Sequence, residues 1–304
     1  MEARALNQCH AIVAFQDGKQ ILAERFKGPS LDQAVAIKSV SKTLIAALAG
    51  IAIDRGEIPS VKTTLGELTP DLIPPDADEK VTNITIENLI TMQAGLQRTS
   101  GPNYFSWINS NDWVGNALSR PMVAEPGTRM LYSTGSYHIL GAVLSAVSGE
   151  SLLSLARARI GQPLNIEIPA WTRDPQGRYL GGNEMALTMT AMIRFGELYR
   201  NEGRAGGRQV LSKRWVMQSL QPVTRSVFSG LGYGYGWFLG ERDGIGYALA
   251  RGYGGQIICI IPALDVTVAI TSDPNRPARS AGYFGDLQRL IESSVIPAAQ
   301  TDKA

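Results

Sequence analysis

One serine and one lysine in this sequence have a spacing that could support nucleophilic catalysis. Ser39-Val40-Ser41-Lys42 is the single Ser-x-x-Lys in the chain, and it stands directly before an apolar helical pattern. Residues three apart lie on one face of a helix, so the Lys42 amine can reach the Ser39 hydroxyl. A serine hydroxyl needs a neighbouring base to attack a carbonyl at neutral pH. Burial would lower the pKa of Lys42 and make it such a base, and a helix N-terminus would favour negative charge developing at Ser39.

Two other hydrolase chemistries fit the sequence less well. A Gly-x-Ser-x-Gly elbow would indicate a Ser-His-Asp hydrolase. The Gly-x-Ser sequences that end at Ser30 and Ser151 have Asp or Leu where the second Gly should stand. A zinc site would need clustered ligands, and two histidines with two isolated cysteines do not supply them, so we expect no metal and no cofactor. Ser-x-x-Lys alone is also a weak signal, because a capping Ser followed by a solvated Lys has the same letters.

Composition restricts the partners that the protein could bind. The chain has 304 residues and a net charge of +2, so we expect no nucleic acid partner. Its longest uncharged apolar run, Leu44–Ile53, is too short to span a membrane. The first residues lack the apolar region of a secretory signal, which predicts a cytoplasmic protein if the N-terminus is complete and otherwise leaves the compartment open. Cys9 and Cys259 lie in apolar runs and are expected to be buried hydrophobes.

The elements that must position Ser39 and Lys42 can be placed by periodicity. Asp17-Gly18 predicts a hairpin between strands 11–15 and 20–26, and apolar spacing predicts a helix over 39–54. Residues 57–184 contain many prolines between short helical patterns. Two helices are then expected over 187–201 and 212–220, followed by strands within 232–271 and a final helix over 280–296. Strands at both ends of the chain predict one sheet domain from 1–56 and 185–304, with 57–184 inserted as a mainly helical domain and a ligand site between them.

Several blocks resemble one known family. Ser39-Val40-Ser41-Lys42-Thr43 is similar to the nucleophile motif of class C β-lactamases and the related penicillin-binding-protein-like esterases, D-aminopeptidases and aminohexanoate-oligomer hydrolases. Further blocks that resemble the family are 89–96, 126–133 and 195–199, and the resemblance extends from about 11 to 295. It implies an α+β fold of three layers, with an antiparallel sheet flanked by helices and an inserted helical region. It also implies an acyl-enzyme at Ser39, with Lys42 and Tyr132 moving protons; which of the two takes the Ser39 proton is left open.

The chain departs from the family pattern at two motifs. Where the family has Tyr-x-Asn, this chain has Tyr132-Ser133-Thr134, and a Thr hydroxyl cannot present the donor and acceptor of an Asn amide together. No Lys-Thr-Gly or His-x-Gly occurs. The corresponding segment is Arg251-Gly252-Tyr253-Gly254-Gly255-Gln256. We place Tyr253 at the Lys/His position, with glycines including Gly255 allowing a close approach to substrate and the Gln256 N–H as the second oxyanion donor. In an alternative register Arg251 is the functional cation.

These departures bear on the substrate. An uncharged Tyr253 favours small neutral esters or amides, or peptide-like molecules, over β-lactams, whose carboxylate the missing Lys or His often binds. The alternatives are a D-amino-acid peptidase or weak β-lactamase, and a penicillin-binding-like protein that acylates without turnover. Arg173-Asp174 stands in an expected loop that could touch substrate, and His138 is expected in the core. Aromatic residues of the insertion could line a pocket or pack in the core, namely Tyr104, Phe105, Trp107, Trp113 and Trp171.

Overall fold

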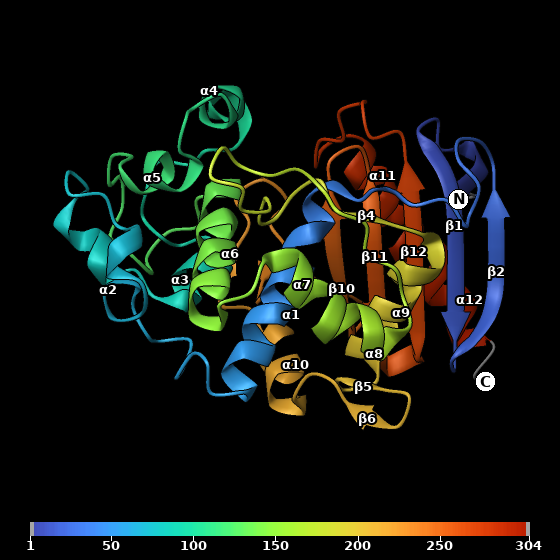
Figure 1. Ribbon diagram of the computed structural model, residues 1–304. Helices are drawn as coiled ribbons and strands as arrows, with labels where there is room; N and C mark the ends of the chain where they lie inside the picture. Colours follow the sequence, from blue (N-terminus) through green and yellow to red (C-terminus); the bar gives the residue numbers. More distant parts are fainter. Residues whose placement is uncertain (1–2, 302–304) are drawn as a thin grey trace.

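The centre of the molecule is an eight-stranded antiparallel sheet, seen in the computed structural model of residues 3–301 (Figure 1). Its order is β2-β1-β12-β11-β10-β9-β8-β7. The strands are β1 (Cys9–Gln16), β2 (Lys19–Arg25), β7 (Thr224–Arg225), β8 (Gly232–Tyr233), β9 (Phe238–Arg242), β10 (Ile245–Gly252), β11 (Gln256–Ile261) and β12 (Val266–Ser272). Because β1 pairs with β12, the two ends of the chain form one sheet, as the sequence predicted. Asp17 and Gly18 both have positive φ, which the tight turn between β1 and β2 requires.

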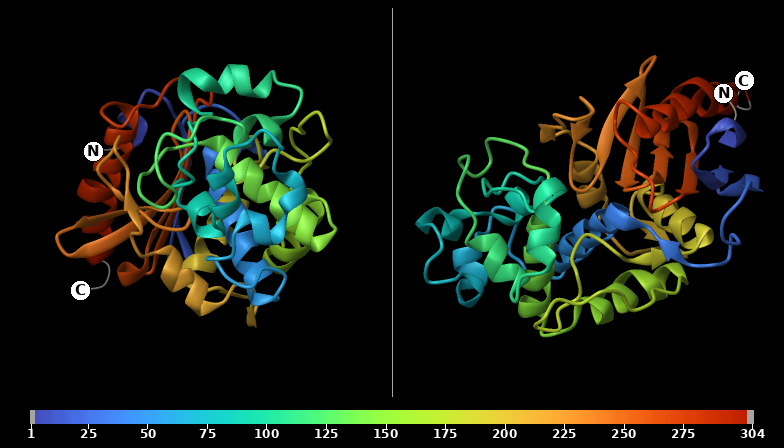
Figure 2. Two further views of the ribbon diagram at one scale, coloured as in Figure 1. Left: turned by 90° about the vertical axis from the view of Figure 1, so that its left-hand side faces the viewer. Right: turned by 90° about the horizontal axis from the view of Figure 1, so that it is seen from above.

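Helices cover both faces of this sheet and make three layers (Figures 1 and 2). One face carries α9 (Met189–Arg200), and the other carries α11 (Tyr283–Leu290), the π-helical η8 (Ile291–Val295) and α12 (Ile296–Thr301). Every residue of β11 and β12 is therefore buried, which explains their almost continuous apolar sequences. Gly196 lets α9 approach closely, since a Cβ there would lie 2.6 Å from Thr267. The predicted three-layer α+β fold is confirmed.

A second group of helices lies beside the sheet, and α1, which is buried over almost its whole length, lies between this group and the sheet. The helices outside the sheet layers are α1 (Ser41–Asp54), α2 (Leu65–Leu68), α3 (Ile86–Ile90), α4 (Tyr104–Ile108), α5 (Trp113–Leu118), α6 (Thr134–Ser148), α7 (Leu152–Ala156), α8 (Gln162–Leu164) and α10 (Lys213–Ser219). Helix α1 contacts α6 on one side and β10 on the other. Within residues 57–184 the described chain forms helices and isolated bridges but no paired strand. The division into two domains stays a prediction.

The structure differs from the sequence expectations mainly in short or terminal elements. Two-residue strands were not predicted, because they are too short to show alternation; they include β3 (Val35–Ala36) with β4 (Ala186–Leu187), and β5 (Arg204–Ala205) with β6 (Arg208–Gln209). The C-terminal helical segment runs to Thr301 rather than ending at 296, with a π-turn in its middle. Cys9 and Cys259 are buried free thiols.

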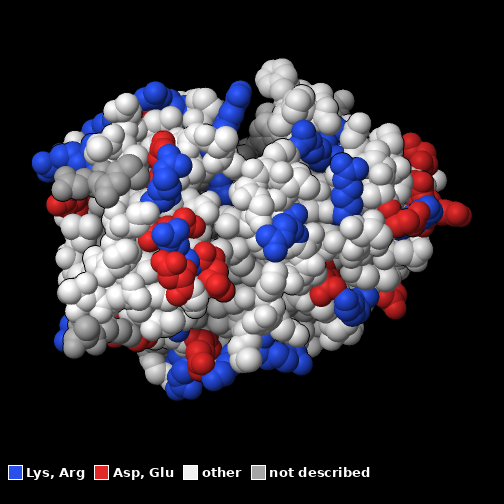
Figure 3. Space-filling view, turned by 180° about the vertical axis from the view of Figure 1, so that it is seen from behind, with Lys and Arg blue, Asp and Glu red and all other residues white. Residues whose placement is uncertain are grey.

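The surface carries both signs of charge. On the face that Figure 3 shows, Lys and Arg side chains are interspersed with Asp and Glu, in keeping with the small net charge. Of the helices in residues 3–301, none is by itself long and apolar enough to cross a membrane; α6 and the segment Leu152–Leu164 meet the length and composition test only as a bent pair.

The position of α1 depends on a close contact with α10. A Cβ at Gly50 would lie 2.5 Å from the buried Trp215 ring. We expect Gly50→Ala to lower the free energy of unfolding by about 1–3 kcal/mol, because the ring cannot move away without disturbing the core. Urea denaturation would measure this. The control is Gly246→Ala, whose Cβ would have no atom within 4 Å. Equal stability of the two variants would contradict the prediction.

Candidate active site

Ser39 lies in a 3-10 turn, η2 (Lys38–Val40), that runs directly into α1. The turn is held by the Ser41 hydroxyl, which donates to the Lys38 carbonyl at 2.6 Å and accepts from the Met185 N–H at 3.3 Å. Lys38 itself has a positive φ of 51°. Ser41 therefore fixes the backbone conformation at the nucleophile, and ties it to the chain leading into β4.

Lys42 is only 2% exposed and its ammonium nitrogen has three oxygen neighbours. Nζ lies 3.0 Å from Ser39 Oγ, 3.2 Å from Thr134 Oγ1 and 2.7 Å from the Gly182 carbonyl oxygen. A carbonyl can only accept, and a neutral amine has two N–H donors and one lone pair. Neutral Lys42 can therefore donate to Gly182 and Thr134 while its lone pair accepts the Ser39 proton.

Burial lowers the pKa of Lys42 to about 7. A substantial fraction of this amine is therefore neutral at pH 7, whereas an ordinary lysine is almost wholly charged there. Burial has the opposite effect on Tyr132: it raises the pKa of that phenol, with smaller lowering contributions from Ser39 and from the charge of Arg251. Lys42 is the better placed of the two to accept a proton near neutral pH, and Tyr132 stays a phenol.

Tyr132 and Thr134 reach the site from the start of α6. The first N–H groups of this helix are capped from another segment: Ser100 Oγ accepts from Thr134 N–H at 2.9 Å, and Thr99 Oγ1 accepts from Gly135 N–H at 2.7 Å. The Tyr132 ring is centred 5.2 Å from Lys42 Nζ. Thr134 Oγ1 thus links Lys42 to Ser100 Oγ, 3.1 Å away, at the position where the family pattern has Asn.

The end of β10 forms the opposite wall of the site. A Cβ at Gly252 would lie 2.2 Å from the Ile37 carbonyl oxygen, so glycine is required where this strand passes the nucleophile turn. Tyr253 follows, half-exposed, and lines the same cavities as Ser39. Within residues 3–301, the backbone N–H groups of Ser39 and Tyr253 donate no hydrogen bond.

Two residues of the predicted site lie elsewhere. Gly255 faces α11, since a Cβ there would lie 2.4 Å from the Tyr283 ring. The Gln256 side chain is fully buried and exchanges hydrogen bonds with the Ser272 backbone at 2.8 and 3.1 Å. Neither residue lines the cavities that contain Ser39. The close approach to the turn that carries Ser39 occurs at Gly252, three residues before Gly255.

Two cavities flank Ser39, and five residues line both. These are Ser39, Tyr132, Phe228, Tyr253 and Ala278. One cavity, of about 490 Å³, is mainly apolar and is closed by Phe238, Phe284 and the segment 278–281, with Arg251 in its wall. The other, of about 770 Å³, is more polar and includes Arg98, Asn183 and the Lys38–Glu184 ion pair at 3.0 Å. The segment 278–284 carries no sequence signal that marks it as part of a site.

Most of the aromatic candidates pack in the core. Trp107 and Trp113 are buried and enclose His138, with ring centroids 5.8 and 5.6 Å from the imidazole. Tyr104 lines the polar cavity, whereas Phe105 is 74% exposed. Trp171 and Arg173-Asp174 line neither cavity, and Asp174 is buried against His138.

His138 and Asp174 form a buried pair that supports the Lys42 site from behind. His138 Nδ1 accepts from the Gly181 N–H at 3.2 Å, so Nε2 carries the proton and donates to Asp174 Oδ2 at 3.1 Å. The next residue, Gly182, supplies the carbonyl that accepts from Lys42. A Cβ at Gly182 would lie 2.9 Å from Lys42 Cγ. His138 thus fixes the Gly181 N–H, and so restrains the backbone one residue before the Gly182 carbonyl that holds the lysine amine; His138 lines neither cavity.

We expect His138→Leu to lower kcat by about tenfold and to move the acid limb of the pH–rate profile to lower pH. Without the acceptor for Gly181 N–H, the Gly182 carbonyl is free to shift, and it then stabilises the charged form of Lys42 less. His138→Gln, which keeps a hydrogen-bonding group, should recover part of both effects. A lower kcat with an unchanged pH profile would contradict the positioning role.

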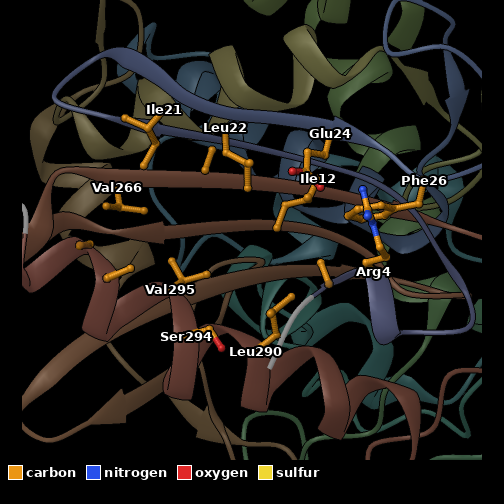
Figure 4. Close-up of a pocket in the computed structure, with 14 residues that line it drawn as sticks. Arg4, Ile12, Ile21, Leu22, Glu24, Phe26, Val266, Leu290, Ser294 and Val295 are labelled. Carbon is orange, nitrogen blue, oxygen red and sulfur yellow. The ribbon is translucent and has the colours of Figure 1, made fainter.

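A third cavity lies away from these residues. Figure 4 shows it between β1–β2 and the C-terminal helices, lined by apolar residues such as Ile12, Leu22 and Leu290 with Arg4 and Glu24 at its edge. Its volume is about 430 Å³. It shares no lining residue with the two cavities at Ser39, so it is not part of the candidate site.

Comparison with known proteins places the chain in a family. The Beta-lactamase family profile matches residues 6–291. Penicillin-binding protein 4 of Amycolatopsis lactamdurans is 23% identical over 293 residues, covering 83% of this chain and 74% of that protein. Among solved structures, a putative 6-aminohexanoate-dimer hydrolase from Bacillus anthracis superposes with a TM-score of 0.78 at 18% identity, over 94% of this chain and 80% of that one. EstCE1, described as a hydrolase with promiscuous acyltransferase activity, superposes with a TM-score of 0.72 at 19% identity, over 86% of this chain and 87% of that one. The chain belongs to the Beta-lactamase family and is a hydrolase.

Proposed function

We propose that this protein is a serine esterase or amidase that forms an acyl-enzyme at Ser39. The observation that carries the proposal is the buried Lys42 amine, 3.0 Å from Ser39 Oγ, with a pKa of about 7. A base is most effective when its pKa lies near the working pH. Lys42 meets this condition.

In the acylation step, Ser39 Oγ attacks the carbonyl carbon of the substrate as its proton passes to Lys42 Nζ. The carbonyl electron pair moves onto oxygen and gives a tetrahedral oxyanion. When this collapses, the bond to the leaving group breaks, the Tyr132 hydroxyl gives its proton to the leaving group, and Lys42 returns a proton to Tyr132. Water then attacks the acyl-enzyme by the same route in reverse and releases the acid and free Ser39.

The oxyanion is stabilised by the backbone N–H groups of Ser39 and Tyr253. Both lack a protein acceptor within the described residues 3–301, and both residues line the two cavities. Fixed N–H donors of this kind contribute about 10²–10³ in rate each. Tyr253 therefore replaces Gln256 as the second donor. In the register expected from the sequence, the second donor, Gln256, stands three positions after Tyr253, which occupies the Lys/His position. With Tyr253 as the donor, the Lys/His position falls on Ala250. This residue is fully buried and uncharged.

The comparisons support hydrolysis in general and leave the substrate to experiment. The names of two structural relatives refer to hydrolysis of a 6-aminohexanoate dimer and to a hydrolase with acyltransferase activity, while the sequence relative is a penicillin-binding protein. Esters and amides share the acyl-enzyme chemistry described above. The sequence departures at Thr134 and at the third motif favour ester or amide hydrolysis over efficient β-lactam hydrolysis.

A stopped-flow assay with 4-nitrophenyl acetate tests the mechanism. We expect a burst of nitrophenol equal to the enzyme concentration, followed by steady turnover, and loss of both in Ser39→Ala. A chromogenic cephalosporin and a D-alanyl amide should be slower substrates. Turnover that survives Ser39→Ala would refute the proposal, and stoichiometric labelling without turnover would instead assign the non-turnover binder.

A further inference from the structure

Arg251 is a buried cation in the wall of the apolar cavity beside Ser39. Arg251 is 9% exposed and is the second-last residue of β10. The guanidinium carbon lies 4.0 Å from the centre of the Phe284 ring and 4.9 Å from that of Phe238. Two aromatic rings thus lie against the guanidinium and shield it from water.

No carboxylate of the protein neutralises this charge. Within residues 3–301 Arg251 has no ion pair, and its hydrogen-bond partner is Ser280 Oγ at 3.4 Å. Burial lowers the pKa of Arg251 to about 10, which still leaves it protonated at neutral pH. A buried charge without a counter-ion is costly, and an anionic ligand would remove that cost.

The rest of the cavity carries positive charge and apolar surface. The charged residues that line it are Arg251 and the exposed Arg279, and no Asp or Glu of the described chain lines it. The phenyl rings of Phe228, Phe238 and Phe284 with Ala278 and Ala281 supply the apolar part. In the neighbouring polar cavity Lys38 is neutralised by Glu184, and the other cation, Arg98, lies over the Phe228 ring.

We propose that the apolar cavity binds the acyl arm of the substrate and that Arg251 binds a carboxylate at the end of that arm. The preferred substrate is then a monoester or monoamide of a short dicarboxylic acid. A planar guanidinium offers two parallel N–H donors to a carboxylate, which gives direction as well as charge. The leaving group would occupy the polar cavity. This substrate class differs from the neutral ester expected from the sequence, because the cation is Arg251, the residue that the alternative register named, and not the residue at position 253.

The proposal can be tested without a variant, although it rests on the proposed function of Ser39. Two esters with six-carbon acyl groups are compared in the wild-type protein: mono-4-nitrophenyl adipate, which ends in a carboxylate, and 4-nitrophenyl hexanoate, which does not. We expect kcat/KM to be about 10–100-fold higher for the adipate ester, as for a charge-assisted pair. Equal values, or a preference for hexanoate, would overturn the proposal.

Variants assign the preference to Arg251. In Arg251→Met the ratio of the two kcat/KM values should fall to about one or below, and Arg251→Lys should retain part of it. Arg276→Met removes an exposed arginine outside the cavity and should keep the wild-type ratio. If Arg251→Met lowered both substrates equally, Arg251 would act through Tyr132 or through packing, and the carboxylate site would be refuted.

A binding measurement separates this proposal from the proposed function. Calorimetry on Ser39→Ala needs no turnover; we expect adipate monomethyl ester to bind at least tenfold more tightly than dimethyl adipate. Equal affinities would overturn the carboxylate site even if Ser39 proves to be the nucleophile. Tighter binding of the monoester together with ester turnover that survives Ser39→Ala would support the site and refute the proposed function.

Discussion

Replacing Lys42 with methionine is expected to lower kcat/KM for 4-nitrophenyl acetate by about 10³-fold. Removal of a positioned general base typically costs 10²–10⁴ in rate, and Lys42 Nζ is the basic nitrogen that lies 3.0 Å from Ser39 Oγ. Methionine has a similar length and can fill the space of the buried Lys42 side chain, so the variant should fold. Near-ultraviolet circular dichroism would check this. Initial rates at several substrate concentrations would give kcat and KM separately, and we expect the loss in kcat.

The same lysine predicts the pH dependence of the wild-type enzyme. A base must be neutral to accept a proton, and the pKa of Lys42 is about 7 because the amine is buried. We therefore expect kcat/KM to rise with pH, with an acid limb whose midpoint is about 7 and whose slope below it is about tenfold per pH unit. This limb should disappear in the residual activity of Lys42→Met.

The matched control is Lys213→Met, which removes a lysine that is 58% exposed on α10. Its rate and pH profile should equal those of the wild type. If Lys42→Met kept activity within tenfold of wild type, or if the wild-type profile were flat between pH 5.5 and 7.5, Lys42 would not be the base. Tyr132 would then be the remaining candidate.

The sequence alone predicts a contact in the site only between residues that are close together in the chain. Ser39 and Lys42 are three residues apart on one helical turn, so their contact follows from helix geometry. Tyr132 and Thr134 were identified from a family resemblance, because nothing local places residues about 90 positions away beside Lys42. The sheet was predictable from the alternating and apolar patterns of its longer strands. Pairs of two-residue strands such as β3 and β4 were not, since two residues show no period.

The third motif shows why the remaining part is hard to place from the sequence. Three glycines lie between positions 252 and 255, and each lacks a side chain for a different tertiary reason: Gly252 passes Ile37, Gly254 passes Asp273, and Gly255 faces Tyr283. The sequence alone does not tell these contacts apart, and the proposed register differs by three residues from the one expected from the sequence. The wall formed by 278–284 and the role of Arg251 depend on α11 folding across the end of β10. That packing has no local signal.

Gly252→Ala is expected to lower kcat/KM by about 10²-fold or more and to lower the free energy of unfolding by about 1–3 kcal/mol. The added Cβ would lie 2.2 Å from the Ile37 carbonyl oxygen, which belongs to the backbone and cannot rotate away. Either β10 or the turn that carries Ser39 must therefore move. The two proposed oxyanion donors, the N–H groups of Ser39 and Tyr253, stand on opposite sides of this contact, so their separation changes with it.

The two consequences can be separated by measuring them in one set of variants. Gly246→Ala adds a methyl group to the other end of β10, where no atom lies within 4 Å, and should change neither activity nor urea stability. Gly50→Ala should destabilise the fold through Trp215 while leaving the strand beside Ser39 in place. If Gly50→Ala and Gly252→Ala lost equal stability but only Gly252→Ala lost activity, the loss would come from the oxyanion geometry. If Gly252→Ala kept activity within threefold of wild type, Tyr253 N–H could not be the second donor. The added Cβ forces the backbone beside Tyr253 to move, and a donor that stabilises the oxyanion must keep a fixed position.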